Sequence, residues 1–173
     1  LEREIFSKEE LIERFSLERV QKGGAIFDRE KLDWMSREYI KKMSDDDFCK
    51  IVKPLVPKKC VPLFKGRISK FSDLEREAKF LTNPEDYPAE LLIWKQTPPE
   101  NIKKHLQKIL EILEADGKEK IMAYAQKEGR GEVLWPLRAA LSGQKNSPGP
   151  FEIMDCLEKD ESVKRIIKAI SKL

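Results

Sequence analysis

The stretch TPPENIKKHLQKILEILEADG, Thr97 to Gly117, has the clearest structural pattern in this chain. Its apolar residues Ile102, Leu106, Ile109 and Leu113 recur every three or four positions, which places them on one face of a helix. A Thr-Pro pair precedes the pattern, and proline is tolerated where a helix begins. The stretch therefore predicts an amphipathic helix that buries its apolar face in a core.

Helix-start signals elsewhere predict a succession of further short helices. Serine followed three positions later by an acidic residue is typical of a capped helix start, and a lone aspartate can cap a helix as well. The capping residues are Ser7, Asp28, Ser44 and Ser72, and the serines have Glu10, Asp47 and Glu75 as their acidic partners. No alternating strand pattern longer than a few residues occurs. We therefore predict an all-α fold.

A turn signal divides this helical sequence at one place. The segment NPEDYP at residues 83–88 reads as a turn after which Pro88 restarts a helix. No low-complexity linker accompanies it. We predict a multi-helix bundle of two packed helical subdomains, residues 1–83 and residues 84–173.

The composition is that of a soluble globular protein with a heavily charged exterior. Charged residues make up 38% of the chain and apolar residues 40%, and neither a membrane span nor a signal peptide is recognisable. Cys49, Cys60 and Cys156 form no C-x-x-C pair, which argues against a disulfide framework or a zinc site. We expect these thiols to fill apolar niches in a cytoplasmic protein. The chain lacks an initiator Met, so we expect it to be a fragment.

The distribution of charge is more informative than the net charge of +3. Seven cationic residues and no acidic residue lie between Lys50 and Ser72, directly after the triplet Asp45 to Asp47. The basic run predicts a local positive field that suits a polyanion, although it also fits a solvated face. The aspartates are explained by a capped, solvated helix start better than by a metal cluster.

Few residues in the chain are suited to catalysis. His105 is the one histidine, and we expect it to be partly exposed on the flank of the predicted amphipathic helix. The glycines match neither a P-loop nor a dinucleotide-binding fingerprint. We therefore do not expect this polypeptide to be a self-sufficient enzyme.

A second stretch, LWPLRAALSGQKNSPGPFEI from Leu134 to Ile153, combines a short helix with an unusual loop. Pro136 is expected near the start of the helix, and Gly143 can supply a left-handed stop. Pro148 and Pro150 fix two backbone angles in the loop, which lowers the entropy lost when a ligand binds.

The loop residues suit a splayed single-stranded RNA, whose bases expose hydrogen-bonding edges and whose phosphates need cations. Ser142, Gln144, Asn146 and Ser147 offer donors and acceptors, and Arg138 and Lys145 supply charge without a competing carboxylate nearby. An ordinary helix–turn–helix connector is the alternative interpretation.

The amino-acid sequence of this stretch resembles the anticodon-reading segment of bacterial-type glutamyl-tRNA synthetases. FSLERVQKGGAIFDREKLDWMSREYI, residues 15–40, resembles the stem-contact region that follows the catalytic domain of the same family. The two stretches occur in the order and with the spacing of that family, and the turn EDYP, Glu85 to Pro88, lies between them at the expected place. The resemblance therefore covers essentially all 173 residues.

The resemblance implies a role for several residues. Arg138 corresponds to the arginine that faces the anticodon bases. Arg67 corresponds to a basic position that reads the third base and selects glutamate over glutamine tRNA, although its flanking residues depart from the commoner R-x-K-T-L. The loop that contacts the first and middle bases corresponds to Ser147, Pro148, Gly149 and Pro150, and we count Gln144 and Lys145 with it as RNA-binding candidates.

The family's enzyme joins glutamate to tRNA(Glu) with ATP and Mg²⁺, on a class I catalytic domain with HIGH- and KMSKS-type signatures. Neither signature occurs here. The resemblance therefore implies the carboxy-terminal tRNA-binding part of the enzyme, inactive alone, without a cofactor of its own, and monomeric. Its implied partners are tRNA(Glu), tRNA(Gln) as a second candidate, and the catalytic domain. A helical adaptor whose basic face meets an acidic protein is the alternative.

Overall fold

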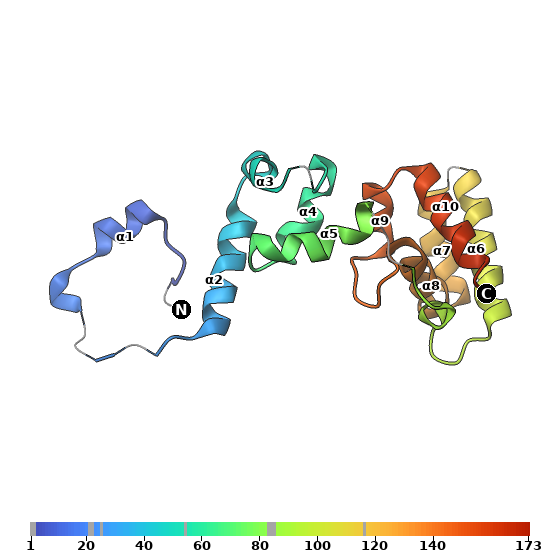
Figure 1. Cartoon of the computed structure of the whole chain (residues 1–173), viewed down its shortest axis with the longest axis horizontal. Helices are drawn as coiled ribbons and strands as arrows, with labels where there is room; N and C mark the ends of the chain where they lie inside the picture. Colours follow the sequence, from blue (N-terminus) through green and yellow to red (C-terminus); the bar gives the residue numbers. More distant parts are fainter. Residues whose placement is uncertain (1–2, 21–22, 25, 54, 83–85, 116) are drawn as a thin grey trace.

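The computed structural model describes residues 3–20, 23–24, 26–53, 55–82, 86–115 and 117–173, which form helices and connecting turns (Figure 1). No strand occurs in these ranges, and the all-α prediction is confirmed. Within the same ranges, none of the helices is long and apolar enough to cross a membrane. The α-helices are α1 Lys8–Arg14, α2 Arg29–Lys42, α3 Asp45–Val52, α4 Val61–Lys65, α5 Leu74–Thr82, α6 Pro99–Glu114, α7 Lys118–Glu128, α8 Arg130–Ser142, α9 Pro150–Cys156 and α10 Lys159–Ile170. The 3₁₀ helices are η1 Leu17–Arg19, η2 Lys58–Cys60, η3 Phe71–Asp73 and η4 Ala89–Leu92.

Local capping explains where three of the α-helices begin. Ser7 and Glu10 form a reciprocal capping box at α1. The side chains of Asp28 and Ser44 accept backbone N–H groups in the first turns of α2 and α3. These three predicted starts are confirmed. Ser72 instead lies inside η3, because the chain enters α5 through a 3₁₀ turn.

The amphipathic stripe of α6 packs against α7, α8 and α10. Ile102, Leu106 and Ile109 have no exposed surface, as the periodicity predicts. His105 was expected to be partly exposed, and that expectation is wrong: its side chain is buried, and Nδ1 lies 2.8 Å from the hydroxyl of Tyr124 on α7. His105 lies three positions after Ile102 and four before Ile109, so it shares the buried face of the helix.

α8 contacts α6, α7, α9 and α10 and forms the centre of the carboxy-terminal bundle. The helix begins at Arg130 and not near Pro136, which lies inside it. An internal proline removes one backbone hydrogen bond. Pro136 is buried, and its neighbours Val133 and Leu137 are completely buried. Burial on several sides therefore outweighs the local penalty of the proline.

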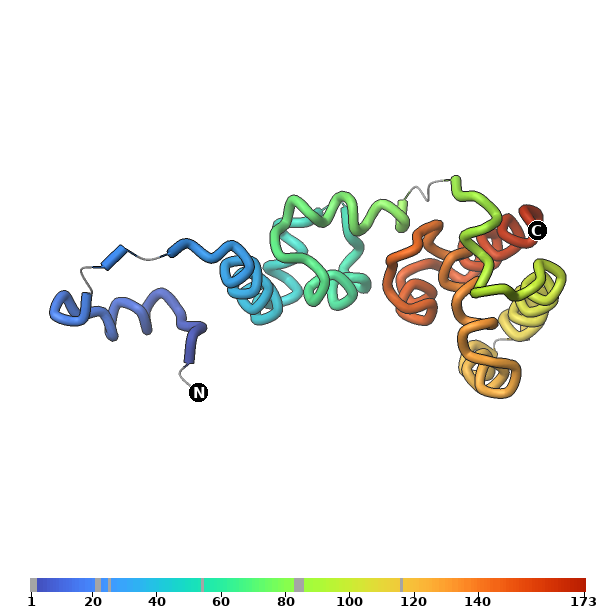
Figure 2. Tube along the Cα trace, turned by 90° about the horizontal axis from the view of Figure 1, so that it is seen from below, coloured from blue at the N-terminus to red at the C-terminus, as the bar shows by residue number. Residues whose placement is uncertain are grey.

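The molecule is elongated, and its helices form groups that follow one another along the long axis (Figures 1 and 2). α2 to α5 form a middle group, and α6 to α10 form a bundle at the carboxyl end. The two groups pack together, because η2 contacts α9 and α5 contacts α8. The predicted boundary at residues 83–84 lies outside the described residues.

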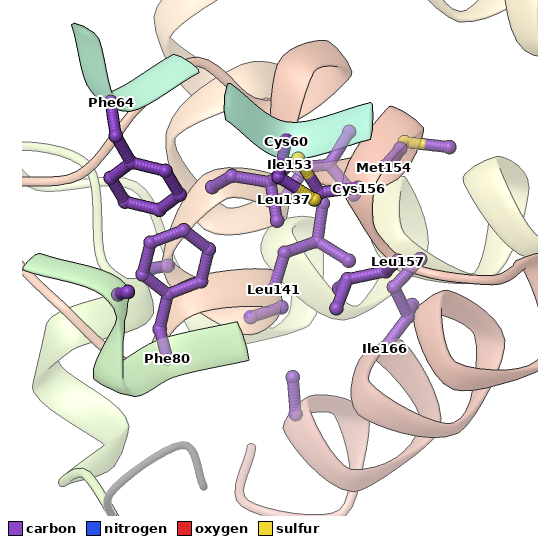
Figure 3. Packing of buried hydrophobic residues seen from close by; sticks show 14 of the residues in the cluster. Cys60, Phe64, Phe80, Leu137, Leu141, Ile153, Met154, Cys156, Leu157 and Ile166 are labelled. Carbon is purple, nitrogen blue, oxygen red and sulfur yellow. The ribbon is translucent and has the colours of Figure 1, made fainter. Parts of the chain in front are cut away.

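Apolar side chains fill the junction between these groups (Figure 3). Phe64 of α4 faces Phe80 of α5, with ring centroids 6.2 Å apart. Cys60 of η2 and Cys156 of α9 lie side by side, although they are far apart in the sequence. All three cysteines are free and buried, which confirms that they fill apolar niches. Burial raises the pKa of the Cys60 and Cys156 thiols.

The segment that contains α1 and η1 extends away from the middle group in both views (Figures 1 and 2). Polar contacts between described residues link it to α2: the Tyr39 hydroxyl donates to the Phe6 carbonyl at 2.5 Å, and Lys31 pairs with Glu4 at 2.7 Å. The large apolar side chains left exposed along this segment are those of Leu11, Ile12, Phe15, Leu17, Val20, Ile26 and Phe27. Such a set of exposed apolar residues is typical of a surface that another protein part covers.

Candidate nucleic-acid interface

The loop between α8 and α9 is fixed from its first residue. Gly143 has φ 66° and ψ 16°, a left-handed conformation in which a Cβ is unfavourable, and its N–H donates to the Ala139 carbonyl at 2.8 Å. The predicted left-handed stop is confirmed. The buried Ser142 hydroxyl donates to the Arg138 carbonyl at 2.8 Å and accepts the Gln144 N–H at 3.2 Å. The helix therefore leads into a loop of defined direction.

The Arg138 guanidinium braces this loop by donating hydrogen bonds to it. Its Nη2 donates to the Lys145 carbonyl at 2.9 Å, and its Nη1 lies 3.4 Å from both the carbonyl and the hydroxyl of Ser147. It also stacks over the Trp135 ring, 4.6 Å from the centroid, and the Trp135 indole N–H is held by the Leu91 carbonyl at 3.0 Å. Arg138 has no carboxylate partner among the described residues, so its positive charge is not neutralised by an ion pair.

The predicted loop residues differ in how far solvent reaches them. Lys145 is exposed, whereas Gln144, Ser147 and Gly149 are half-buried. Pro148 and Pro150 are buried, and Pro150 occupies the first position of α9. The prolines therefore hold the loop from inside, and its exposed groups are polar.

Arg67 approaches this loop from the other helical group. It lies beyond the end of α4, and its side chain is 34% exposed. An open cavity of about 430 Å³ is lined by Arg67, Pro148 and Gly149, together with Lys59, Glu152 and Asp155. The structure thus brings together two groups of predicted site residues that are far apart in the sequence.

Charges of both signs surround the cavity. Burial and, second, the positive charge of Arg67 lower the pKa of Arg138. Arg67 is 3.7 Å from the Glu77 carboxylate, and Asp155 pairs with Lys118. A cavity that offers both donors and acceptors matches the edge of a nucleobase.

The basic run between Lys50 and Ser72 carries less free charge than the sequence indicated. The aspartates of the preceding triplet turn back onto it, and Lys59 reaches α9. The pairs are Asp45 with Lys65 at 2.9 Å, Asp46 with Lys58 at 2.6 Å, Asp47 with Lys50 at 2.7 Å, and Glu158 with Lys59 at 2.7 Å. The expected positive field is therefore weakened by local pairing. In the described ranges no three His, Cys, Asp or Glu side chains are grouped as metal ligands.

Three further residues at this interface were not among the predicted site residues. Trp135 lies three positions before Arg138 on α8, and this helical spacing predicts contact between the two side chains. Glu152 and Asp155 lie three positions apart on α9 and face the cavity. Their spacing predicts that they share one face of a helix, but nothing in the sequence indicates that α9 faces Arg67.

A family model described as an anticodon binding domain matches residues 10–170. This chain belongs to that family. The anticodon-binding domain is 36% identical to a glutamate–tRNA ligase of Clostridium botulinum (strain Hall) over 193 residues, which cover 99% of this chain and 40% of the ligase. It is 37% identical to the glutamate–tRNA ligase of Clostridium acetobutylicum, over 98% of this chain and 40% of that protein. The domain thus spans about two fifths of the curated relatives it matches.

Solved structures give the same result for the fold of the anticodon-binding domain. The crystal structure of a glutamate tRNA ligase from Elizabethkingia meningosepticum, in complex with its amino acid, superposes with a TM-score of 0.78 at 27% identity. The match covers 97% of this chain and 37% of that one. Glutamate-tRNA synthetase from Elizabethkingia anophelis gives a TM-score of 0.77 at the same identity, over 96% of this chain and 36% of the other.

Proposed function

We propose that this anticodon-binding domain reads the anticodon of tRNA(Glu) in the cavity between Arg67 and the loop after α8. The observation that carries the proposal is the convergence of Arg67, Pro148 and Gly149 on one cavity. Arg138 braces the loop that forms one wall. A cavity that combines apolar walls with an arginine and carboxylates suits unstacked RNA bases, whose edges are recognised by hydrogen bonds.

Phosphate contacts and base contacts have separate sources in this proposal. The exposed ammonium of Lys145 attracts the phosphates without regard to sequence, and this attraction weakens as salt is added. Arg67 tests the third anticodon base, and the residues Ser147 to Pro150 test the first and middle bases. Arg138 acts in the same site, and its bonds to the loop carbonyls support a positioning role.

The wider assignment rests on the similarity to glutamate–tRNA ligases. We propose that the domain positions tRNA(Glu) for aminoacylation by the catalytic domain of the same ligase, in the cytoplasm. ATP and Mg²⁺ would act on that catalytic domain. The exposed apolar residues around α1 suit contact with it. We also propose that residues 1–83 and 84–173 are two packed helical subdomains, and that the domain functions as a monomer.

Titration with RNA hairpins tests the proposal. One hairpin carries a glutamate anticodon, and three others each change one anticodon base. We expect each change to weaken binding roughly 5- to 150-fold, because one well-placed base contact contributes about 1–3 kcal/mol of discrimination. Affinity for all four hairpins should fall steeply as salt rises.

Equal affinity for the four hairpins would refute anticodon reading. The change of the third base from cytidine to guanosine, which gives a glutamine anticodon, has a separate meaning. Undiminished affinity for that hairpin alone would show that tRNA(Gln) is accepted as well.

A further inference from the structure

A second open cavity, of about 730 Å³, lies where η4 leads into α6. The residues that line it include Trp94, Lys95, Gln96 and Asn101, and Glu132 from α8. An aromatic face beside ammonium, amide and carboxylate groups fits an unstacked nucleobase, which has a π face and an edge of donors and acceptors. The Glu132 carboxylate makes the cavity a poor site for a phosphate.

The turn that presents Trp94 to this cavity is fixed and strained. Lys95 has φ 53°, and it is the one non-glycine residue with a positive φ in the part of the chain that the structure describes. The backbone N–H and the hydroxyl of Thr97 both donate to the Trp94 carbonyl, at 3.0 and 2.8 Å. This conformation places the Lys95 ammonium 5.5 Å from the centroid of the Trp94 ring. The turn therefore holds the indole and a cation together at the cavity.

The Trp94 indole packs closely against α8, and ring contacts connect it to the loop after that helix. A Cβ on Gly131 would lie 2.3 Å from Nε1 of Trp94, so α8 can approach the ring only because this residue is glycine. The Trp94 and Trp135 ring centroids are 5.1 Å apart, and Trp135 carries the Arg138 guanidinium on its ring. A continuous series of ring contacts thus runs from this cavity to the residue that braces the candidate anticodon site.

We infer that this second cavity binds one base of the anticodon loop that lies outside the triplet, by stacking it on Trp94. The inference rests on the proposed function, which gives the triplet to Arg67 and the loop after α8. Trp94 contacts Trp135, and Trp135 contacts Arg138, so the second cavity adjoins the helix that supports the candidate anticodon site. A base held by its π face tolerates any sequence, so this contact adds affinity without adding anticodon specificity.

The test uses the full chain, the variants Trp94→Leu and Trp94→Phe, and hairpins with a glutamate anticodon. In each of a second set of hairpins, one loop nucleotide outside the triplet is replaced by an abasic residue. Trp94→Leu should weaken binding of the intact hairpin at least about fivefold, and Trp94→Phe should weaken it much less, because phenylalanine keeps a stacking face. With one particular abasic hairpin, Trp94→Leu should bind as well as the wild type does. The preference for the glutamate triplet should persist in both variants.

Two results would overturn the inference: Trp94→Leu binds the intact hairpin as tightly as the wild type, or it loses the same factor with every abasic hairpin. A measurement on the wild-type chain covers the case in which the leucine variant does not fold. A 2-aminopurine at the stacked position should lose fluorescence on binding, and unchanged emission at every loop position outside the triplet would refute stacking.

The outcomes also separate this inference from the function on which it rests. A wild-type chain that prefers the glutamate triplet, with no effect of Trp94→Leu, refutes the second cavity alone. A wild-type chain that binds hairpins without any preference refutes anticodon reading, whereas a base-dependent effect of Trp94 would still support stacking. Failure to bind any hairpin refutes both.

Discussion

Replacing Arg165 with methionine should lower the free energy of unfolding by about 3–5 kcal/mol, the usual cost of breaking a buried charged network by removing one partner. Arg165 is only 6% exposed. Its guanidinium donates to the carbonyls of Phe80 and Leu141 at 2.7 Å and of Leu81 at 3.3 Å, and its Nε donates to Glu161 at 2.7 Å. The three carbonyls lie in the last turns of α5 and α8, where helical carbonyls lack partners and attract cations. Methionine would remove the hydrogen bonds that Arg165 donates to all three carbonyls.

Denaturant unfolding of wild-type and variant chains measures this change. Arg165→Lys keeps the charge, but a single ammonium cannot reach all three carbonyls, so we expect an intermediate loss. Lys164→Met is the matched control, because Lys164 is exposed on the same helix, and its effect should stay within about 0.5 kcal/mol. A loss below about 1 kcal/mol for Arg165→Met would mean that this network does not hold the two helical groups together.

Arg138→Ala should reduce discrimination at the first and middle anticodon bases by about 2 kcal/mol, roughly 30-fold, because charged hydrogen bonds contribute on that scale. The substitution frees the Lys145 and Ser147 carbonyls, and the loop loses the brace that fixes it beside the cavity. Discrimination at the third base should change less, since we assign that base to Arg67. Titration of the three single-base hairpin variants with the substituted chain measures each effect separately.

Two further variants distinguish the hydrogen bonds that Arg138 makes to the loop from the effect of its positive charge alone. Arg138→Lys should not restore discrimination, since an ammonium cannot reproduce the forked contacts to two carbonyls. Arg130→Ala removes an exposed arginine from the same helix and should leave base preference unchanged. If Arg138→Ala weakens all hairpins by one common factor, Arg138 has no role in reading the anticodon and only attracts phosphates.

Most of the fold could be predicted from the sequence, because the patterns that indicate its helices are local. The apolar spacing of α6 and the caps Ser7, Asp28 and Ser44 depend on neighbours within a few residues, and the structure has them as predicted. The helical role of Pro136 was not readable, because burial in the centre of the bundle overrides its local preference. Arg165 was not singled out either, because its partners lie on α5 and α8 and only the folded chain brings them together.

The sequence predicted the individual residues of the candidate site, but not how the fold brings them together. The glycine stop, the prolines and Arg138 all lie in one stretch, and the family resemblance added Arg67. That Arg67 would share a cavity with this loop depends on how the middle group packs on the bundle, and no local pattern encodes that packing. The weakened charge of the basic run was partly readable, since Asp45 to Asp47 directly precede the lysines with which they pair.

Photo-crosslinking from the anticodon tests most directly whether the cavity beside Arg67 is the anticodon site. A glutamate-anticodon hairpin with 4-thiouridine at its middle position would be bound to the wild-type chain, irradiated, and the attached peptides identified by mass spectrometry. We predict crosslinks to residues 144–149, and fewer of them with the Arg138→Ala chain. Crosslinks confined to the surfaces of α6, α7 or α10, with none on the loop after α8, would contradict the assignment.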